Sequence, residues 1–232
     1  FILKLLNFCP VLLDHYSNED YSSYQTGLKN EVNVDFAVHD AKVFKEYAMD
    51  VLGIPADNIL FELNAEMMTM NRAINKMSLV IKNAGSEAEV FVYYAGHGFP
   101  DKKTKEPYLI PVNVSGTDLE YAIKLKELYD RLTEYPAQRI VVFIDACFSG
   151  GARNQGLVSA RGVKVAPRED VLKGNILVFS ASSAEQSSLP YKEKGHGMFT
   201  YFLLKYLQET KGNSSFGELT DYVKNRLLPV LL

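Results

Sequence analysis

The sequence has little of several features that define whole classes of protein. Its 232 residues include only two cysteines, Cys9 and Cys147, and no tryptophan. Two cysteines cannot build a disulfide framework. Free thiols in a reducing compartment such as the cytoplasm are therefore expected rather than a bridge, with Cys9 as an inert apolar residue. No apolar run reaches the roughly 18 residues that span a bilayer, so no membrane span is expected.

An excess of one charge sign is also lacking. The chain carries 25 Lys and Arg against 28 Asp and Glu, for a formal net charge of −3. Proteins that coat nucleic-acid phosphates are markedly basic, so a nucleic-acid partner is not expected. The contents of 47% apolar and 23% charged residues are ordinary for a globular protein. The length suits one domain over 1–232, and the oligomeric state stays open.

The ends of the sequence look cut. The chain begins at Phe1 without a methionine, and residues 1–13 are apolar with one lysine. This segment lacks the basic start and the small-residue cleavage site of a signal peptide. We therefore expect a truncated strand or helix there.

Apolar patterns alternate between strands and helices along the chain. Strands are predicted over 59–63, 89–94, 139–144 and 175–179, and helices over 35–52, 69–84, 121–132, 198–209 and 216–228. The strands are continuous apolar runs, which is typical of parallel strands covered on both faces. The pattern predicts a three-layer α/β domain with a central, mostly parallel sheet.

Reactive side chains follow two of the predicted strands. His97 stands between Gly96 and Gly98 after one strand, and Asp145 and Cys147 follow another. Because ligands bind at the carboxyl ends of parallel strands, we expect His97 and Cys147 at one sheet edge. A cysteine attacks carbonyl carbons as its thiolate, and a nearby imidazole can take its proton or protonate a leaving amine. The N–H groups of Gly98 and Cys147 are candidates for holding the oxyanion.

These residues belong to a longer pattern. Cys147 lies 50 residues after His97, and four segments read YYAGHG (93–98), DACFSG (145–150), FSAS (179–182) and GHGMFTY (195–201). With these motifs the sequence resembles the caspase-like cysteine peptidases, and specifically their metacaspase-type bacterial branch. The resemblance covers most of the chain. It implies a caspase-like fold and a cysteine endopeptidase with His97 and Cys147 as its catalytic dyad.

The resemblance also implies substrates with basic residues. Caspases carry Gln two places before the nucleophile, whereas metacaspases carry Asp there and cleave proteins or peptides after Arg or Lys. Asp145 occupies this place, and Asp40 matches the family's second pocket carboxylate. Two carboxylates in a partly desolvated pocket favour a guanidinium or ammonium group. Ser180 and Ser182 are expected to line the same pocket.

The family's pattern of self-cleavage predicts how the single domain is divided. Residues 1–149 correspond to a large-subunit-like part, 150–174 to a processing loop and 175–232 to a small-subunit-like part. The processing loop offers Arg153, Arg161 and Lys164 as candidate autocleavage sites. A sixth strand of the family's sheet is expected to lie beyond Leu232.

Neither a cofactor nor a metal is predicted. Calcium-dependent metacaspases use a cluster of acids, part of it soon after the nucleophile, and residues 148–162 contain no acid. Calcium activation is therefore not expected from this sequence. The G-x-S-x-G, Walker lysine and H-E-x-x-H motifs and a second cysteine pair are absent as well.

Simpler roles stand beside the functional ones. Asp145 could cap the following turn, and Asp40 could complement a helix dipole. His39 is interpreted as a surface residue, and His196 as a loop or cap residue that could line the groove. The alternatives for the whole chain are a catalytically silent caspase-like scaffold, or a caspase-fold peptidase of clostripain-like or gingipain-like specificity.

Overall fold

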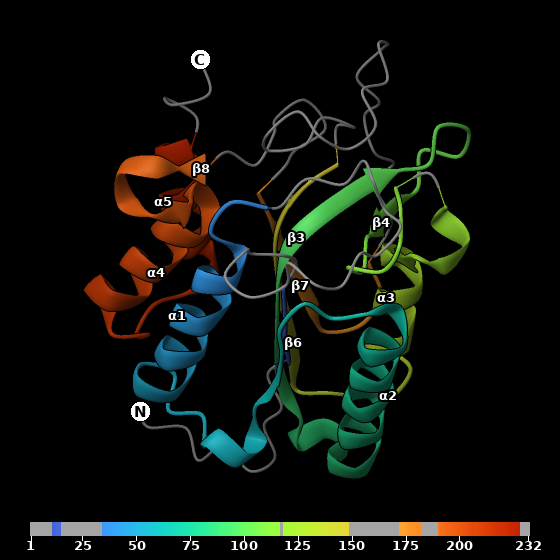
Figure 1. Cartoon of the computed structure of the whole chain (residues 1–232). Coiled ribbons are helices and arrows are strands. Elements are labelled where there is room, and N and C mark those ends of the chain that lie inside the picture. Colours follow the sequence, from blue (N-terminus) through green and yellow to red (C-terminus); the bar gives the residue numbers. More distant parts are fainter. Residues whose placement is uncertain (1–10, 15–33, 117, 149–171, 182–189, 228–232) are drawn as a thin grey trace.

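The fold is known from a computed structural model that describes residues 11–14, 34–116, 118–148, 172–181 and 190–227. Within these residues, seven strands form one mixed sheet (Figure 1). Five of them are parallel neighbours in the order β2 (Leu60–Glu62), β1 (Val11–Asp14), β3 (Glu89–Pro100), β6 (Arg139–Cys147) and β7 (Ile176–Ser180). β4 (Pro107–Leu109) runs antiparallel to the end of β3, and β5 (Ile123–Lys124) antiparallel to β4.

Helices cover both faces of this sheet. α1 (Ala37–Asp50), α4 (Met198–Thr210) and α5 (Phe216–Leu227) lie on one side, and α2 (Met67–Ala84) and α3 (Leu125–Leu132) on the other (Figure 1). A short antiparallel pair, β8 (Pro190–Tyr191) and β9 (His196–Gly197), precedes α4. The predicted α/β class with a mostly parallel sheet between helical layers is thus confirmed.

The two faces of β3 and β6 contribute to separate cores. Val92 and Tyr94 of β3 pack in the core under α2 and α3, whereas Phe91 and Tyr93 pack in the core under α1, α4 and α5. In β6 the same alternation sends its odd-numbered residues, such as Phe143, toward α1 and α4. Both faces are apolar because both are covered, which is why these strands look continuous in sequence.

The structure differs most from the predicted element ends in two places. β3 and β6 run on together until His97 pairs with Cys147, so both residues lie within strands rather than just after them. The helix predicted over 121–132 begins only at Leu125, because the preceding Ile123 and Lys124 pair with β4 as strand β5. Of the strand or helix expected in residues 1–13, the structure describes only the end, where β1 begins at residue 11, and residues 1–10 lie outside the described residues.

Candidate active site

The structure brings His97 and Cys147 to the same level on adjacent strands. His97 of β3 is the register partner of Cys147 of β6, at the carboxyl ends of these parallel strands. Neighbouring strands lie about 4.8 Å apart, so the two backbones are in direct lateral contact. Their exposed fractions are only 4% for His97 and 6% for Cys147, which forms no disulfide. Both residues have odd numbers, and the odd-numbered residues of β3 and β6 lie on the sheet face that α1 and α4 cover.

Two contacts hold the backbone around His97. The Tyr94 hydroxyl donates to the His97 carbonyl at 2.7 Å, and the Ile110 N–H donates to the same oxygen at 3.0 Å. The next residue, Gly98, leaves room for the Phe148 ring, because a Cβ there would lie 2.5 Å from that ring and would force it to shift. Phe148 therefore packs directly on the backbone that follows the histidine. The oxyanion role of the Gly98 and Cys147 N–H groups stays a prediction.

Asp145 is fully buried and interacts with the start of α4. Its Oδ2 accepts hydrogen bonds from the Thr200 hydroxyl at 2.6 Å and from the Thr200 N–H at 3.3 Å. Because the Thr200 hydrogen goes to the carboxylate, the Tyr93 phenol donates to Thr200 Oγ1, at 2.7 Å. This chain of hydrogen bonds ties β3, α4 and β6 together. A carboxylate at a helix N-terminus is stabilised by the orphan N–H groups and the helix dipole.

Asp40 is fully buried in the first turn of α1 and faces the same segment. Its Oδ1 lies 2.6 Å from His196 Nδ1, and its Oδ2 accepts the Gly197 N–H at 2.8 Å. His196 stands on the solvent side of this pair with a 16% exposed side chain. The His39 ring lies 4.8 Å from the His196 ring, and most of the His39 side chain is exposed. Partial desolvation is the larger cause that lowers the pKa of His39, and the nearby charge of His196 is the second.

Both predicted pocket acids thus converge on residues 196–200. The sequence identified Asp40 and Asp145, but it did not predict that Thr200 binds one and His196 the other. The only signal was the GHGMFT motif, in which His196 was interpreted as a loop or cap residue. Capping of α4 by acids from other elements also means that Asp40 and Asp145 have a structural role, whatever else they bind.

The remaining predicted site residues are placed only in part. Ser180 is exposed at the carboxyl end of β7, next to β6 and opposite Ile144. Ser182 and the autocleavage candidates Arg153, Arg161 and Lys164 lie outside the described residues. In the part of the chain that is described, no group of three or more His, Cys, Asp or Glu side chains is placed to hold a metal ion. No helix of these ranges is both long and apolar enough to cross a membrane.

Fold and site together define an α/β protein of caspase-like architecture with histidine and cysteine on adjacent parallel strands. A sequence model of the caspase domain, a peptidase family, matches residues 17–228. The chain therefore belongs to the caspase-domain family of peptidases, which confirms the resemblance in its motifs. The finer assignment to the metacaspase-type branch stays a prediction.

Many solved structures share this fold, and two of them are given as examples. A protein from Geobacter sulfurreducens has a TM-score of 0.62 and 16% identity, with 95% of this chain and 89% of that chain covered. Caspase-1 from Spodoptera frugiperda has a TM-score of 0.60 and 12% identity, with 96% of this chain and 77% of that chain covered. At such identities these neighbours establish the fold alone.

One curated relative is similar in sequence. A probable protease from a Desulfuromonadales bacterium is 24% identical over an alignment of 204 residues that covers 80% of this chain. The alignment covers 25% of the relative, so the present chain spans about a quarter of that protein's length.

Proposed function

We propose that this chain is a cysteine endopeptidase that cleaves protein substrates after Arg or Lys, with His97 and Cys147 as its catalytic dyad. The observation that carries the proposal is the register of β3 and β6, which pairs the imidazole-bearing residue with the thiol-bearing one. A cysteine outside any disulfide and a histidine on neighbouring strand ends meet the first requirement of thiol catalysis, which is proximity. Membership of a peptidase family supplies the substrate class.

The reaction follows from these two groups. His97 accepts the proton of the Cys147 thiol, and the thiolate attacks the carbonyl carbon of the scissile peptide bond. The tetrahedral intermediate collapses to a thioester when His97 returns that proton to the departing amine. His97 then takes a proton from water, the hydroxide attacks the thioester, and the proton returns to Cys147 as the acid is released. Backbone N–H groups would stabilise the oxyanion in both steps.

The basic specificity rests on Asp145 and Asp40. Asp145 lies two residues before Cys147 on the same face of β6, and Asp40 lies at the same helix N-terminus as Asp145. Carboxylates in a water-poor site attract a cationic side chain more strongly than exposed ones do. His196 covers Asp40 in the structure, so a substrate cation meets His196 before it reaches this carboxylate.

A panel of fluorogenic peptides tests the specificity. Peptides ending in Arg or Lys before the reporter are expected to be cleaved at least about a hundredfold faster than an otherwise identical Asp peptide, because Asp would meet two acids of its own charge. The comparison is made in kcat/KM, with and without calcium. Preference for the Asp peptide would contradict the proposal. Failure to cleave any peptide, together with no labelling of Cys147 by a peptidyl-arginine electrophile, would favour the catalytically silent scaffold.

Autocleavage between β6 and β7 is a second expectation. Active protein is expected to give two bands on a denaturing gel, with the cut after Arg153, Arg161 or Lys164, whereas the Cys147→Ala protein stays intact. Mass spectrometry identifies the new termini, and a variant with all three basic residues changed to Gln serves as the uncut control. A single intact band for active wild-type protein would refute self-processing and leave peptide cleavage unaffected.

A further inference from the structure

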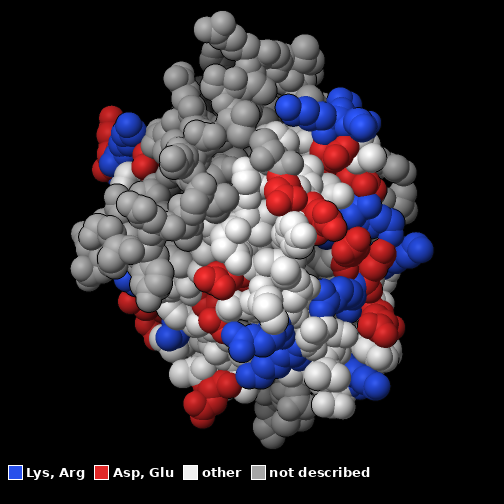
Figure 2. Space-filling view, turned by 45° about the vertical axis from the view of Figure 1, so that its right-hand side comes forward, with Lys and Arg blue, Asp and Glu red and all other residues white. Residues whose placement is uncertain are grey.

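We propose that the hairpin tip between β3 and β4 is an accessory surface that binds acidic segments of the protein substrate. The tip carries Lys102, Lys103 and Lys105, which we call the lysine tip, and all three are exposed. Figure 1 shows this hairpin standing out from the sheet at the end of β3, and Figure 2 shows basic side chains gathered on the corresponding part of the surface. The nature of the partner rests on the proposed peptidase function.

The lysine tip has a defined conformation. Asp101 Oδ1 accepts the N–H groups of Lys103 at 2.8 Å and Thr104 at 2.7 Å. The Asp101 N–H donates to the Glu106 carbonyl, and the Lys105 N–H donates to the Asp101 carbonyl. Such an Asx turn positions the backbone that carries the lysines. A binding surface with a preset backbone loses less conformational entropy when a partner docks.

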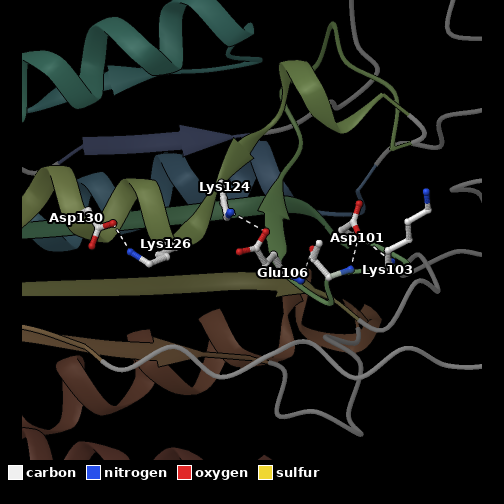
Figure 3. A network of polar contacts seen from close by, with 7 residues as sticks. Asp101, Lys103, Glu106, Lys124, Lys126 and Asp130 are labelled. Carbon is white, nitrogen blue, oxygen red and sulfur yellow. Dashed lines mark hydrogen bonds and ion pairs between the residues drawn. The ribbon is translucent and has the colours of Figure 1, made fainter.

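The neighbouring lysines are already neutralised. Lys124 forms an ion pair with Glu106 at 2.6 Å, and Lys126 pairs with Asp130 one turn along α3 (Figure 3). By contrast, no ion pair joins the lysine tip to a carboxylate among the described residues. The Asp101 carboxylate is directed at backbone N–H groups (Figure 3), and these hydrogen bonds, with a smaller contribution from the charge of Lys103, lower the pKa of Asp101. Lys105 Nζ donates to the Lys102 carbonyl at 2.8 Å, a neutral acceptor that leaves the charge of this ammonium group uncompensated. The positive charges at the lysine tip are therefore available to an external anion.

The position of the lysine tip relates it to the candidate active site. His97 and Asp101 are four residues apart along β3 and its continuation, which at about 3.3 Å per residue is about 13 Å. An extended substrate bound at Cys147 covers that distance with roughly four residues. Salt screens charges beyond about 8 Å at physiological ionic strength, so the lysines act by direct contact. The expected partner is a run of Glu or Asp about four residues from the cleaved bond.

A peptide suits the lysine tip better than a nucleic acid. Proteins that bind nucleic-acid backbones neutralise several phosphates along a continuous basic surface. Here Asp101 and Glu106 flank the three lysines, and the whole chain has a net charge of −3. Three ammonium groups match the few carboxylates of a short acidic segment.

The test measures binding in a Cys147→Ala chain, so that cleavage is not needed. The fluorescent peptides come in two pairs that share one Arg. Within a pair the peptides differ only in a run of three Glu or three Gln about four residues from the Arg, which precedes the Arg in one pair and follows it in the other. We expect the Glu peptide to bind roughly tenfold more tightly at low salt, because exposed ion pairs add modestly and several act together. Lys102→Gln/Lys103→Gln/Lys105→Gln is expected to abolish this preference.

A matched control removes equal charge elsewhere. Lys76→Gln/Lys211→Gln/Lys224→Gln changes three exposed lysines that lie outside the hairpin, and it is expected to keep the preference. Equal binding of the Glu and Gln peptides, or equal loss in both triple variants, would overturn the lysine tip as a specific surface. Tighter binding of a single-stranded oligonucleotide, lost in the tip variant alone, would overturn the peptide assignment. Absence of cleavage by the wild-type chain would instead refute the proposed function. It would leave the lysine tip untouched, because peptide binding is measured without cleavage.

Discussion

Replacing Cys147 with alanine is expected to lower kcat/KM on an arginyl peptide by at least about a thousandfold, because no other group can form the thioester. His97→Ala should cause a loss of similar size, since the thiol then has no base and the leaving amine no acid. In the proposed mechanism the two residues, which the β3–β6 register pairs, act as one unit. The double variant should therefore be no less active than the worse single variant. Fluorogenic assays at equal protein concentration measure all three.

The control for this result is fold integrity. Cys147 is 6% exposed and small, so Cys147→Ala should change the free energy of unfolding by no more than about 1 kcal/mol. Urea denaturation checks this. Residual activity of either single variant within about tenfold of wild type would show that His97 and Cys147 are not the dyad.

The second large effect is expected at Asp145. In Asp145→Asn the side chain keeps an oxygen that accepts the Thr200 hydrogen bonds but loses its charge. If Asp145 binds the substrate's guanidinium, kcat/KM on an arginyl peptide should fall by roughly a hundredfold. For the matched peptide with citrulline, which is the uncharged isostere of Arg, kcat/KM should fall far less. The ratio of the two rates therefore reports recognition of charge.

This comparison also separates recognition from capping. If Asp145 only caps α4, Asp145→Asn should lower kcat/KM by the same factor for both peptides. That outcome would contradict a role of Asp145 in specificity. Asp145→Ala removes the acceptor altogether and should destabilise the fold by about 1–3 kcal/mol, because the buried Thr200 N–H and hydroxyl then lose the carboxylate to which they donate. Asp130→Asn removes a charge from an exposed site on α3 and serves as the neutral control.

Local sequence patterns were sufficient for the features that depend on neighbouring residues. The runs that form β3 and β6 are recognisable because both of their faces are apolar, and the motifs after them placed His97 and Cys147 at one edge. Helix ends at glycine were also predictable, as at Gly85 after α2. Both features are encoded within short windows of the chain.

Features that depend on distant pairing could not be predicted in this way. Ile123 looks helical in its own window, but pairing with β4 makes it a strand. The hydrogen bond between Asp145 and Thr200 joins residues 55 positions apart, and the contact between Asp40 and His196 joins residues 156 positions apart. Nothing in a local window shows that a buried acid from one element caps a helix from another. These partners become visible only when the layers are packed.

The register that pairs His97 with Cys147 also bears on how the proposed peptidase could be controlled. Both residues belong to the central, doubly covered strands of the sheet, and such strands open to solvent only when the whole domain unfolds, as amide hydrogen exchange reports. The relative position of His97 and Cys147 is therefore set by the part of the molecule that has the highest free energy of opening. A signal that switches such a protein on or off would have to act on substrate access or on the α4 junction, rather than by assembling the dyad.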